Sequence, residues 1–333
     1  MKGEGIIGAA DTVTKAYIRK NEVFADAFNY FMYDGRQKIQ PEQLRELDST
    51  EIAILLNEKD TKDKTNKEKE ASEQKMVQKY RDLLKTATIM EDGEATYVLL
   101  GIENQTEVHY AMPVRNMLYD AMQYNQQVTE IAEKHKGKKG GKRQQKISTG
   151  EFLSGFYKNN KLIPVITLVL FFNPGEWDGP RSLFDMLDIS NPIFKKYAQD
   201  YKIHIISPKE ILESDLKKFS SSLREVIGCI KYSNDKNKLA AFIQDNPRMN
   251  IEVEAARVLE VITHTHIKRE EVDDMGNVNM CKAIQEMIQD GRDEGRVQLL
   301  VTLIQSGDIS LQRAAALMSM TPEEFQEKSK MIS

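Results

Sequence analysis

The sequence predicts an α/β core in residues 1–210 and an α-helical region in residues 211–333. The first observation is a set of apolar, β-branched segments at 95–103, 163–172 and 201–206, each with the composition of a strand. The second is that segments with helical spacing separate these strands. The third is that every periodic segment of the C-terminal region has helical spacing.

The first elements in chain order are helical. Between residues 12 and 32, apolar and aromatic side chains recur at spacings of three and four, which predicts one helix, and Asp34-Gly35 ends it. We expect a short polar helix at 41–47 and a short strand at 51–56. Residues 57–79 are dominated by Lys, Glu, Asp and Thr, and they therefore predict a solvated, flexible insertion.

Two strands at 81–90 and 95–103 follow, and Asp92-Gly93 between them is a hairpin signal. Side chains alternate along a strand, so Glu103 and Gln105, two residues apart, share one face. The hairpin places the start of its first strand beside the end of its second strand.

The remaining elements complete the predicted core and the C-terminal region. Pro113 in the first turn is typical of a helix start at 112–133, and residues 134–147, rich in Gly and Lys, predict a flexible loop. A strand at 163–172, a helix at 182–199 and a strand at 201–206 end the core. Helices are then expected at 214–230, 237–244, 253–263 and 279–305, with two short helices near Leu311 and Pro322.

Composition narrows the class of protein. The 333 residues are 40% hydrophobic and 29% charged, values typical of a soluble globular protein, and the net charge is −4. No apolar run approaches the ~18 residues that a membrane span needs, and the N-terminus lacks the long apolar core of a secretory signal. Cys229 and Cys281 form neither a disulfide framework nor a zinc motif. We therefore expect a cytoplasmic protein without membrane contact, in which nucleic-acid binding depends on local charge.

Two carboxylates and an amide form the candidate site. Asp82 begins one strand of the hairpin, Glu103 closes the other, and Gln105 follows two residues later. The hairpin can bring both acids to one edge of the sheet, where they can hold Mg²⁺ or another divalent ion and activate water for phosphodiester hydrolysis. A carboxylate at a strand end is more often merely solvated. Glu103, however, ends a buried strand, where an ionised group is costly unless it is paired or metal-bound.

Three parts of the chain carry a resemblance to a known family. They are YRDLLK, followed about twenty residues later by LLGIENQTEVHYAMPVRNMLYDAMQY; ADTVTKAYIRKNEVFADAFNYFM; and GRDEGRVQLLVTLIQSGDISLQRAAALMSMTPEEF. Together they resemble the recombination-promoting nuclease family, also described as YhgA-like transposases, of the PD-(D/E)XK nuclease superfamily. The resemblance implies a restriction-endonuclease-like core, which is a mixed sheet flanked by helices. It also implies a metal-dependent DNA endonuclease, a hydrolase linked to recombination or mobile DNA.

The same resemblance implies roles for individual residues. Asp82 matches the strand aspartate of that family and Glu103 the glutamate of (D/E)xK, so both are expected to be catalytic and to bind the metal. Gln105, the third expected catalytic residue, stands where the superfamily usually has lysine, a departure that the family shares. Its amide can still hydrogen-bond the attacking water. Candidates for the helical acid that usually precedes the strands are Asp11 and Asp26.

Further polar residues are candidates for supporting roles. Arg115 and Tyr119, four apart on the following helix, point the same way. They either contact phosphate or brace Glu103, or they only pack on the sheet. Residues 134–146 either contact the DNA backbone or form a flexible linker. The candidate DNA contacts in this segment are Lys136, Lys138, Lys139, Lys142 and Arg143.

The expected partner is therefore DNA, and the C-terminal helices offer a surface for a homo-oligomer. The alternative function is a catalytically weak DNA-binding or recombination accessory protein on the same fold. A third alternative is an interaction protein in which the helical C-terminal region dominates.

Overall fold

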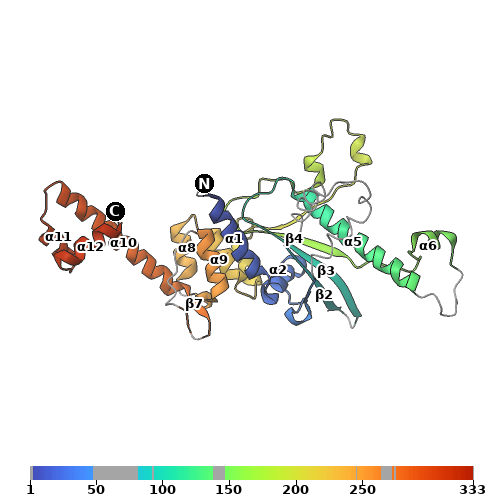
Figure 1. Cartoon of the computed structure of the whole chain (residues 1–333), viewed down its shortest axis with the longest axis horizontal. Helices are drawn as coiled ribbons and strands as arrows, with labels where there is room; N and C mark the ends of the chain where they lie inside the picture. The colour runs from blue at the N-terminus through green and yellow to red at the C-terminus, as the bar shows by residue number, and fades with distance from the viewer. Residues whose placement is uncertain are drawn as a thin grey trace, which may run out of the picture.

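A computed structural model describes residues 3–47, 82–91, 94–137, 147–244, 246–263, 272–273 and 275–332. It contains a five-stranded mixed sheet flanked by helices, followed by a mainly helical C-terminal region (Figure 1). The predicted α/β class is therefore confirmed. Within the described ranges, no helix combines the length and the apolar character that crossing a membrane requires. The predicted strand at 51–56 and the predicted insertion at 57–79 lie outside these ranges.

The sheet has an antiparallel half and a parallel half. Its strands, in spatial order, are β1 (Arg45–Glu46), β2 (Leu83–Glu91), β3 (Glu94–Gln105), β4 (Val165–Phe171) and β5 (His204–Ile206). The first three pair antiparallel, and β3, β4 and β5 pair parallel. Glu91 pairs with Glu94, so two positions separate β2 from β3 and the predicted hairpin is confirmed. The parallel step from β3 to β4 contains helices α5 (Met112–Gly137) and α6 (Thr149–Ser154).

Apolar packing holds helices on both faces of the sheet. The helices on one face are α1 (Gly3–Ile18) and α2 (Asn21–Tyr33). There Phe24 is buried in one hydrophobic cluster with Ile102 of β3. Helix α5 covers the other face, where Met112 is buried in a cluster with Val169 of β4. Fully burying a large apolar side chain stabilises the fold by about 1.5–3 kcal/mol, so both layers are firmly attached.

The predicted helix at 12–32 is in fact two helices, because the chain turns between α1 and α2. The side chain of Lys85, on β2, reaches into this turn and binds its polar atoms. Only 1% of Lys85 is exposed, and its Nζ donates to the Arg19 carbonyl at 2.6 Å and to Asn21 Oδ1 at 2.5 Å. The buried ammonium thus satisfies a carbonyl that the end of a helix leaves open. The predicted stop at Asp34-Gly35 is confirmed, with φ of 55° and 84° in the left-handed region.

The prediction of a helix at 182–199 is wrong. This segment contains two short 3₁₀ turns, η2 (Leu183–Met186) and η3 (Phe194–Lys196). The Asp185 carboxylate accepts a hydrogen bond from the Ser182 N–H and closes the first turn, while Pro192 lacks the N–H that a continuous helix needs. At 41–47 the chain forms a 3₁₀ turn, η1 (Pro41–Gln43), and then enters β1.

Elements after residue 210 contribute to the same hydrophobic cluster as α1 and α2. They are η4 (Glu213–Lys218), α7 (Leu223–Tyr232), α8 (Lys236–Ile243), η5 (Pro247–Met249), β6 (Asn250–Glu252), α9 (Val253–Thr263) and β7 (Asn277–Asn279). Val226 and Leu259 are buried in one cluster with Tyr17 and Phe28. The cluster therefore includes residues from both sides of the expected boundary between 210 and 211.

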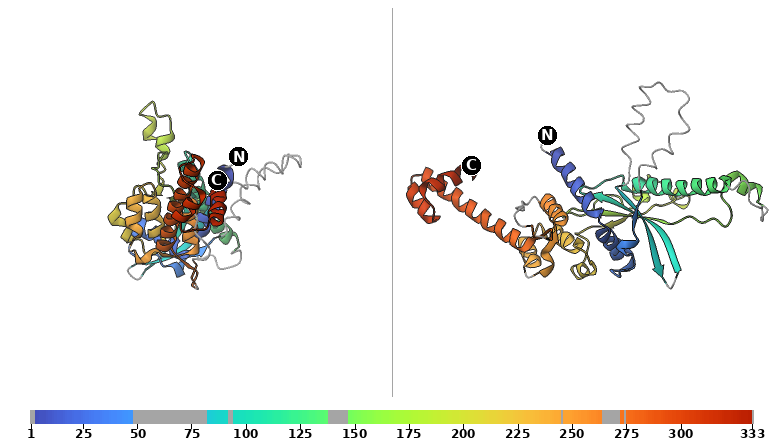
Figure 2. Two further views of the ribbon diagram at one scale, coloured as in Figure 1. Left: turned by 90° about the vertical axis from the view of Figure 1, so that its left-hand side faces the viewer. Right: turned by 60° about the horizontal axis from the view of Figure 1, so that its bottom comes forward.

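Helix α10 (Met280–Gln305) leads away from the sheet to a second, smaller helical cluster (Figure 2). Its other members are α11 (Leu311–Leu317) and α12 (Pro322–Ile332). The cluster is centred on Val297, Ala314 and Phe325. Asn279 begins α10 as predicted, because its side chain accepts a hydrogen bond from the Lys282 N–H at 3.1 Å. The predicted long helix and the two short helices are confirmed.

Candidate functional site

The two candidate acids lie at one end of neighbouring strands. Leu83 pairs with Ile102 in the antiparallel register, which places the preceding residue, Asp82, beside Glu103. The Asp82 Oδ2 atom accepts a hydrogen bond from the backbone N–H of Asn104 at 2.9 Å. The Asp82 side chain therefore reaches across to the end of β3, directly after Glu103.

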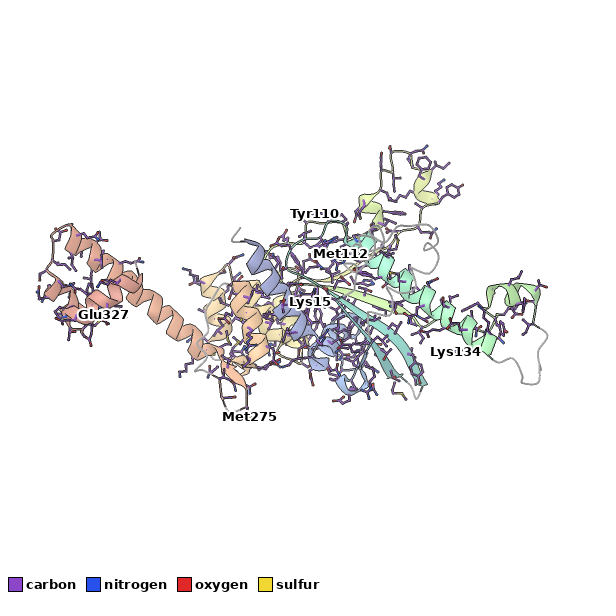
Figure 3. All side chains as sticks on the ribbon, viewed as in Figure 1. Lys15, Tyr110, Met112, Lys134, Met275 and Glu327 are labelled. Carbon is purple, nitrogen blue, oxygen red and sulfur yellow. The ribbon has the colours of Figure 1, made fainter. Side chains whose placement is uncertain are left out.

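A lysine from α1 contacts the Asp82 carboxylate. Lys15 Nζ lies 3.0 Å from Asp82 Oδ1 and 2.7 Å from Oδ2 of Asp11, which is one turn earlier on the same helix. Burial opposes the charged form of Lys15, but the hydrogen bonds and charges of the two acids outweigh it and raise the pKa of Lys15 above its ordinary value. The lysine therefore stays protonated between two carboxylates; Figure 3 marks its place on α1.

Glu103 is fully buried and forms an ion pair with α5. Its side chain is 0% exposed, and its Oε2 lies 3.1 Å from Nη2 of Arg115. Burial opposes the charge of Arg115, but the neighbouring Glu103 and Tyr119 raise the pKa of Arg115. The guanidinium lies 5.6 Å from the centre of the Tyr119 ring. Burial and then the charge of Glu103 raise the pKa of Tyr119, so the phenol stays neutral.

Gln105 is the last residue of β3 and is half-buried. It pairs with Phe171 of β4, and its backbone carbonyl accepts a hydrogen bond from the Phe172 N–H at 2.8 Å. Strand alternation puts the Gln105 side chain on the same face of the sheet as Glu103. The amide and the two acids therefore lie at one end of the sheet.

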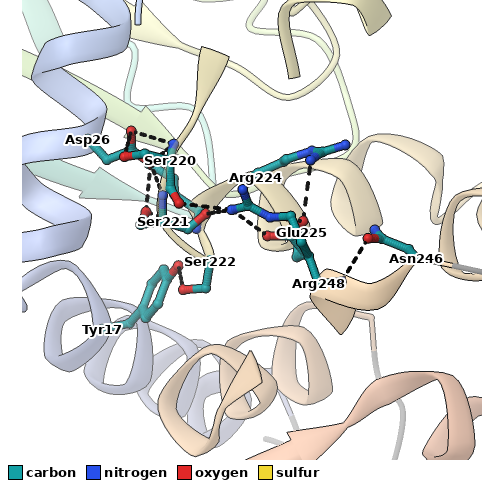
Figure 4. Close-up of polar contacts among 10 residues, drawn as sticks. Tyr17, Asp26, Ser220, Ser221, Ser222, Arg224, Glu225, Asn246 and Arg248 are labelled. Carbon is teal, nitrogen blue, oxygen red and sulfur yellow. Dashed lines mark hydrogen bonds and ion pairs between the residues drawn. The ribbon is translucent and has the colours of Figure 1, made fainter. Parts of the chain in front are cut away.

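The two candidates for a helical acid have different roles. Asp11 joins the site through Lys15 and is 44% exposed. Asp26 does not: its carboxylate accepts hydrogen bonds from the backbone N–H and the hydroxyl of both Ser220 and Ser221, at 2.7–3.1 Å (Figure 4). Asp26 thus holds the turn before α7, and this turn interrupts the helix predicted at 214–230. The role of Asp26 is structural.

Sequence reasoning missed the buried polar groups between α5 and the sheet. Asp120, 8% exposed, accepts hydrogen bonds from the hydroxyls of Thr167 at 2.7 Å and Tyr201 at 2.5 Å. Asn116 is 0% exposed, and its side-chain amide has no hydrogen-bond partner among the described residues. A signal was present in the sequence, because these polar residues recur at helical spacing on the face that begins with Met112.

The donor set at this end of the sheet fits a hard divalent cation. Asp82 and Glu103 offer carboxylate oxygens and Gln105 an amide oxygen, the ligand type that Mg²⁺ prefers, and one or two carboxylates suffice for an ion that keeps several waters. Among the described side chains, no group of three Asp, Glu, His or Cys residues is arranged to hold an ion. Lys15 and Arg115 supply the positive charge beside the two acids.

The candidate DNA-contacting segment begins at the far end of α5 from the site. The helix continues past its predicted end, and Lys134 and Lys136 lie in its last turn, where positive charge favours the helix terminus. Figure 3 shows Lys134 and Met112 at opposite ends of this helix. The other candidate contacts, Lys138, Lys139, Lys142 and Arg143, lie outside the described residues.

Comparisons of this chain with protein-family models, with curated proteins and with solved structures found no match.

Proposed function

We propose that this protein is a metal-dependent DNA endonuclease with a PD-(D/E)XK-type core, and that it acts in recombination or on mobile DNA. The observation that carries the proposal is the placement of Asp82 and Glu103 at one end of adjacent strands, with Lys15 and Arg115 beside them. The sheet supports this proposal, because an antiparallel hairpin leads through a helical crossover to a parallel strand. The resemblance of the hairpin and α5 segments to recombination-promoting nucleases points to the same class.

Each side chain has a role that follows from its contacts. Asp82, fixed by the Asn104 N–H, and Glu103, fixed by Arg115, would hold a divalent ion. When bound, that ion lowers the pKa of a coordinated water and stabilises negative charge on the phosphate. Gln105 would orient the attacking water through its amide. Arg115 places a positive charge against the buried Glu103 carboxylate.

The alternative is a DNA-binding or recombination accessory protein with weak catalysis. One observation favours it: both acids already have cationic partners, Lys15 for Asp82 and Arg115 for Glu103. A divalent ion must compete with these partners for the carboxylate oxygens, which weakens metal binding. DNA cleavage is therefore the property that separates the two functions.

A plasmid-nicking assay with Mg²⁺ and with EDTA tests the proposal. Supercoiled plasmid should be nicked only with the divalent ion, and Glu103→Gln or Asp82→Asn should lower the rate by about 10²-fold or more. The matched control is Glu225→Gln. Glu225 is also a buried acid, 1% exposed, and its partner Arg248 is 3.1 Å away and outside the site. This variant should nick at the wild-type rate per folded molecule.

Thermal unfolding of each variant gives the folded fraction by which rates are compared. Equal nicking by wild type, Glu103→Gln and Asp82→Asn would overturn the proposal at this site. Binding of DNA by the wild type without any nicking would support the accessory function instead.

A further inference from the structure

The ammonium of Lys15 contacts Asp82, a carboxylate of the candidate site. Its ammonium lies between two carboxylates from different elements, Asp11 of α1 and Asp82 at the start of β2, and 41% of the side chain is exposed. An ammonium has three N–H donors, and the two acids account for two of them. The third can reach a ligand that enters from solvent at the end of the sheet.

Two other lysines show what a structural role looks like in this fold. Lys85 is 1% exposed and donates to neutral oxygens of Arg19 and Asn21, and burial lowers its pKa. Lys20 forms ion pairs with Glu254 at 3.0 Å and Glu252 at 3.9 Å, and so ties the start of α2 to the C-terminal elements. Neither lysine contacts a residue of the candidate site.

The site lacks one charge that its proposed chemistry would use. The strand position two residues after Glu103 holds Gln105, which is neutral. Negative charge develops on the phosphate during hydrolysis, and a fixed cation beside it stabilises the transition state. Lys15 brings a cation to Asp82 Oδ1, while the other oxygen of that carboxylate bonds the Asn104 N–H beside Glu103. The lysine therefore reaches the same end of the sheet from α1.

We propose that Lys15 is a further catalytic residue, which contacts the scissile phosphate and supplies the positive charge that Gln105 does not. This inference rests on the proposed nuclease function. Asp11, one turn earlier on α1, is a positioning residue, because its carboxylate holds the Lys15 ammonium in place beside Asp82. The positive charge at the site is thus supplied by α1, which packs on the sheet, and not by β3, the strand that carries Glu103.

The proposal is tested by moving the positively charged side chain from position 15 to position 105. Single-turnover nicking with Mg²⁺ is measured for wild type, Lys15→Gln, Lys15→Arg and the double variant Lys15→Gln/Gln105→Lys. Loss of the cation should lower the rate by about 10²-fold. Arginine should keep most of the activity, and Gln105→Lys should restore at least about tenfold in the Lys15→Gln background. The matched control is Lys20→Gln, which also removes a lysine that is paired with two acids. This variant should cleave at the wild-type rate.

A second measurement does not depend on cleavage. Affinity for a short duplex is measured in EDTA over a range of salt concentrations, together with the thermal unfolding of each variant. One lost phosphate contact should reduce the slope of log K against log salt by about 0.9 in Lys15→Gln and leave it unchanged in Lys20→Gln. The double variant should recover the slope.

The outcomes separate the two proposals. If the wild type binds DNA but never nicks it, the nuclease function fails, while a reduced slope in Lys15→Gln still supports the phosphate contact. If Lys15→Gln only lowers the unfolding temperature, with an unchanged slope and no rescue by Gln105→Lys, Lys15 is an anchor between α1 and β2 and the inference is overturned.

Discussion

The guanidinium of Arg115 lies 3.1 Å from a Glu103 carboxylate that is completely buried between β3 and α5. A buried ion pair of this kind contributes little net stability, because desolvation of both charges offsets their attraction. Loss of one partner is different, since it leaves the other charge buried and uncompensated. The pair therefore couples the candidate site to the attachment of α5.

We predict that Arg115→Met lowers the free energy of unfolding by about 3–5 kcal/mol at neutral pH. In the Glu103→Gln background the same substitution should have a much smaller effect, because no buried negative charge remains. Urea denaturation of the four proteins in this double-mutant cycle measures the coupling. Additive effects of the two substitutions would contradict a direct interaction.

Asp26 gives a prediction about stability alone. Its carboxylate receives N–H and O–H donors from Ser220 and Ser221, and Asp26→Asn replaces one acceptor oxygen with an amide donor. We expect a loss of about 3 kcal/mol, since hydrogen bonds to charged groups contribute about 1.5–3 kcal/mol each and are not additive. Asp11→Asn, at an exposed position, should change stability by less than about 0.5 kcal/mol. Equal losses in the two variants would show that Asp26 is not a structural acid.

The surroundings of His109 allow a prediction of how the free energy of unfolding depends on pH. It lies in the turn before α5, and its Nδ1 is buried without a hydrogen-bond partner among the described residues. Burial, followed by the charge of Arg115, lowers the pKa of His109 below 6.5. The unfolded chain therefore binds a proton at higher pH than the folded protein does, and this contribution to stability is lost as the pH falls from about 6.5 towards the folded pKa.

Urea denaturation between pH 7.5 and 5 checks this prediction. The free energy of unfolding should decrease with falling pH, and the decrease should be smaller in His109→Gln, which has no titrating group at this position. Identical pH profiles for the two proteins would mean that His109 is equally easy to protonate in both states.

The basic segment at the end of α5 should raise affinity for DNA without setting sequence preference. Lys136 lies 21 residues beyond Arg115, or about 32 Å along a helix that rises about 1.5 Å per residue. Changing Lys136, Lys138, Lys139 and Lys142 to glutamine should weaken binding to all sequences alike and reduce the salt slope by about 0.9 for each lost contact. Lysine side chains act on phosphates as point charges and rarely read bases by bidentate contacts. An unchanged slope would identify the segment as a linker.

Strands β2 to β5 and the pairing of the β2–β3 hairpin could be predicted because their signals are local, whereas β1 lies in a segment for which a helix was expected. Strands β3 and β4 are apolar runs, and a two-residue turn fixes the pairing of β2 with β3, so Asp82 and Glu103 come to one end of the sheet. Pro113 similarly located the start of α5. The error at 182–199 has a local cause as well, since Pro192 and the Asp185 cap outweighed a weak helical pattern.

Lys15 and Asp26 could not be assigned because their roles depend on packing between distant segments. Nothing in the helical pattern distinguishes Lys15 from Lys20, yet only the first faces Asp82. Asp26 meets Ser220 across 194 positions. Periodicity predicts which face of a helix is buried, but it does not predict which end of the sheet that helix crosses.

The contact between Asp26 and Ser220 also bears on the order in which the chain folds during synthesis. Helices α1 and α2 leave the ribosome well before the side chains that complete their cluster, such as Val226 and Leu259. Until then Tyr17 and Phe28 lack these partners. Exposed apolar surface of this kind binds chaperones and promotes aggregation. A nascent chain released from the ribosome up to residue 210 would carry all five strands of the sheet but an open hydrophobic layer, and the cluster is complete only once Val278 and Met280 have also emerged.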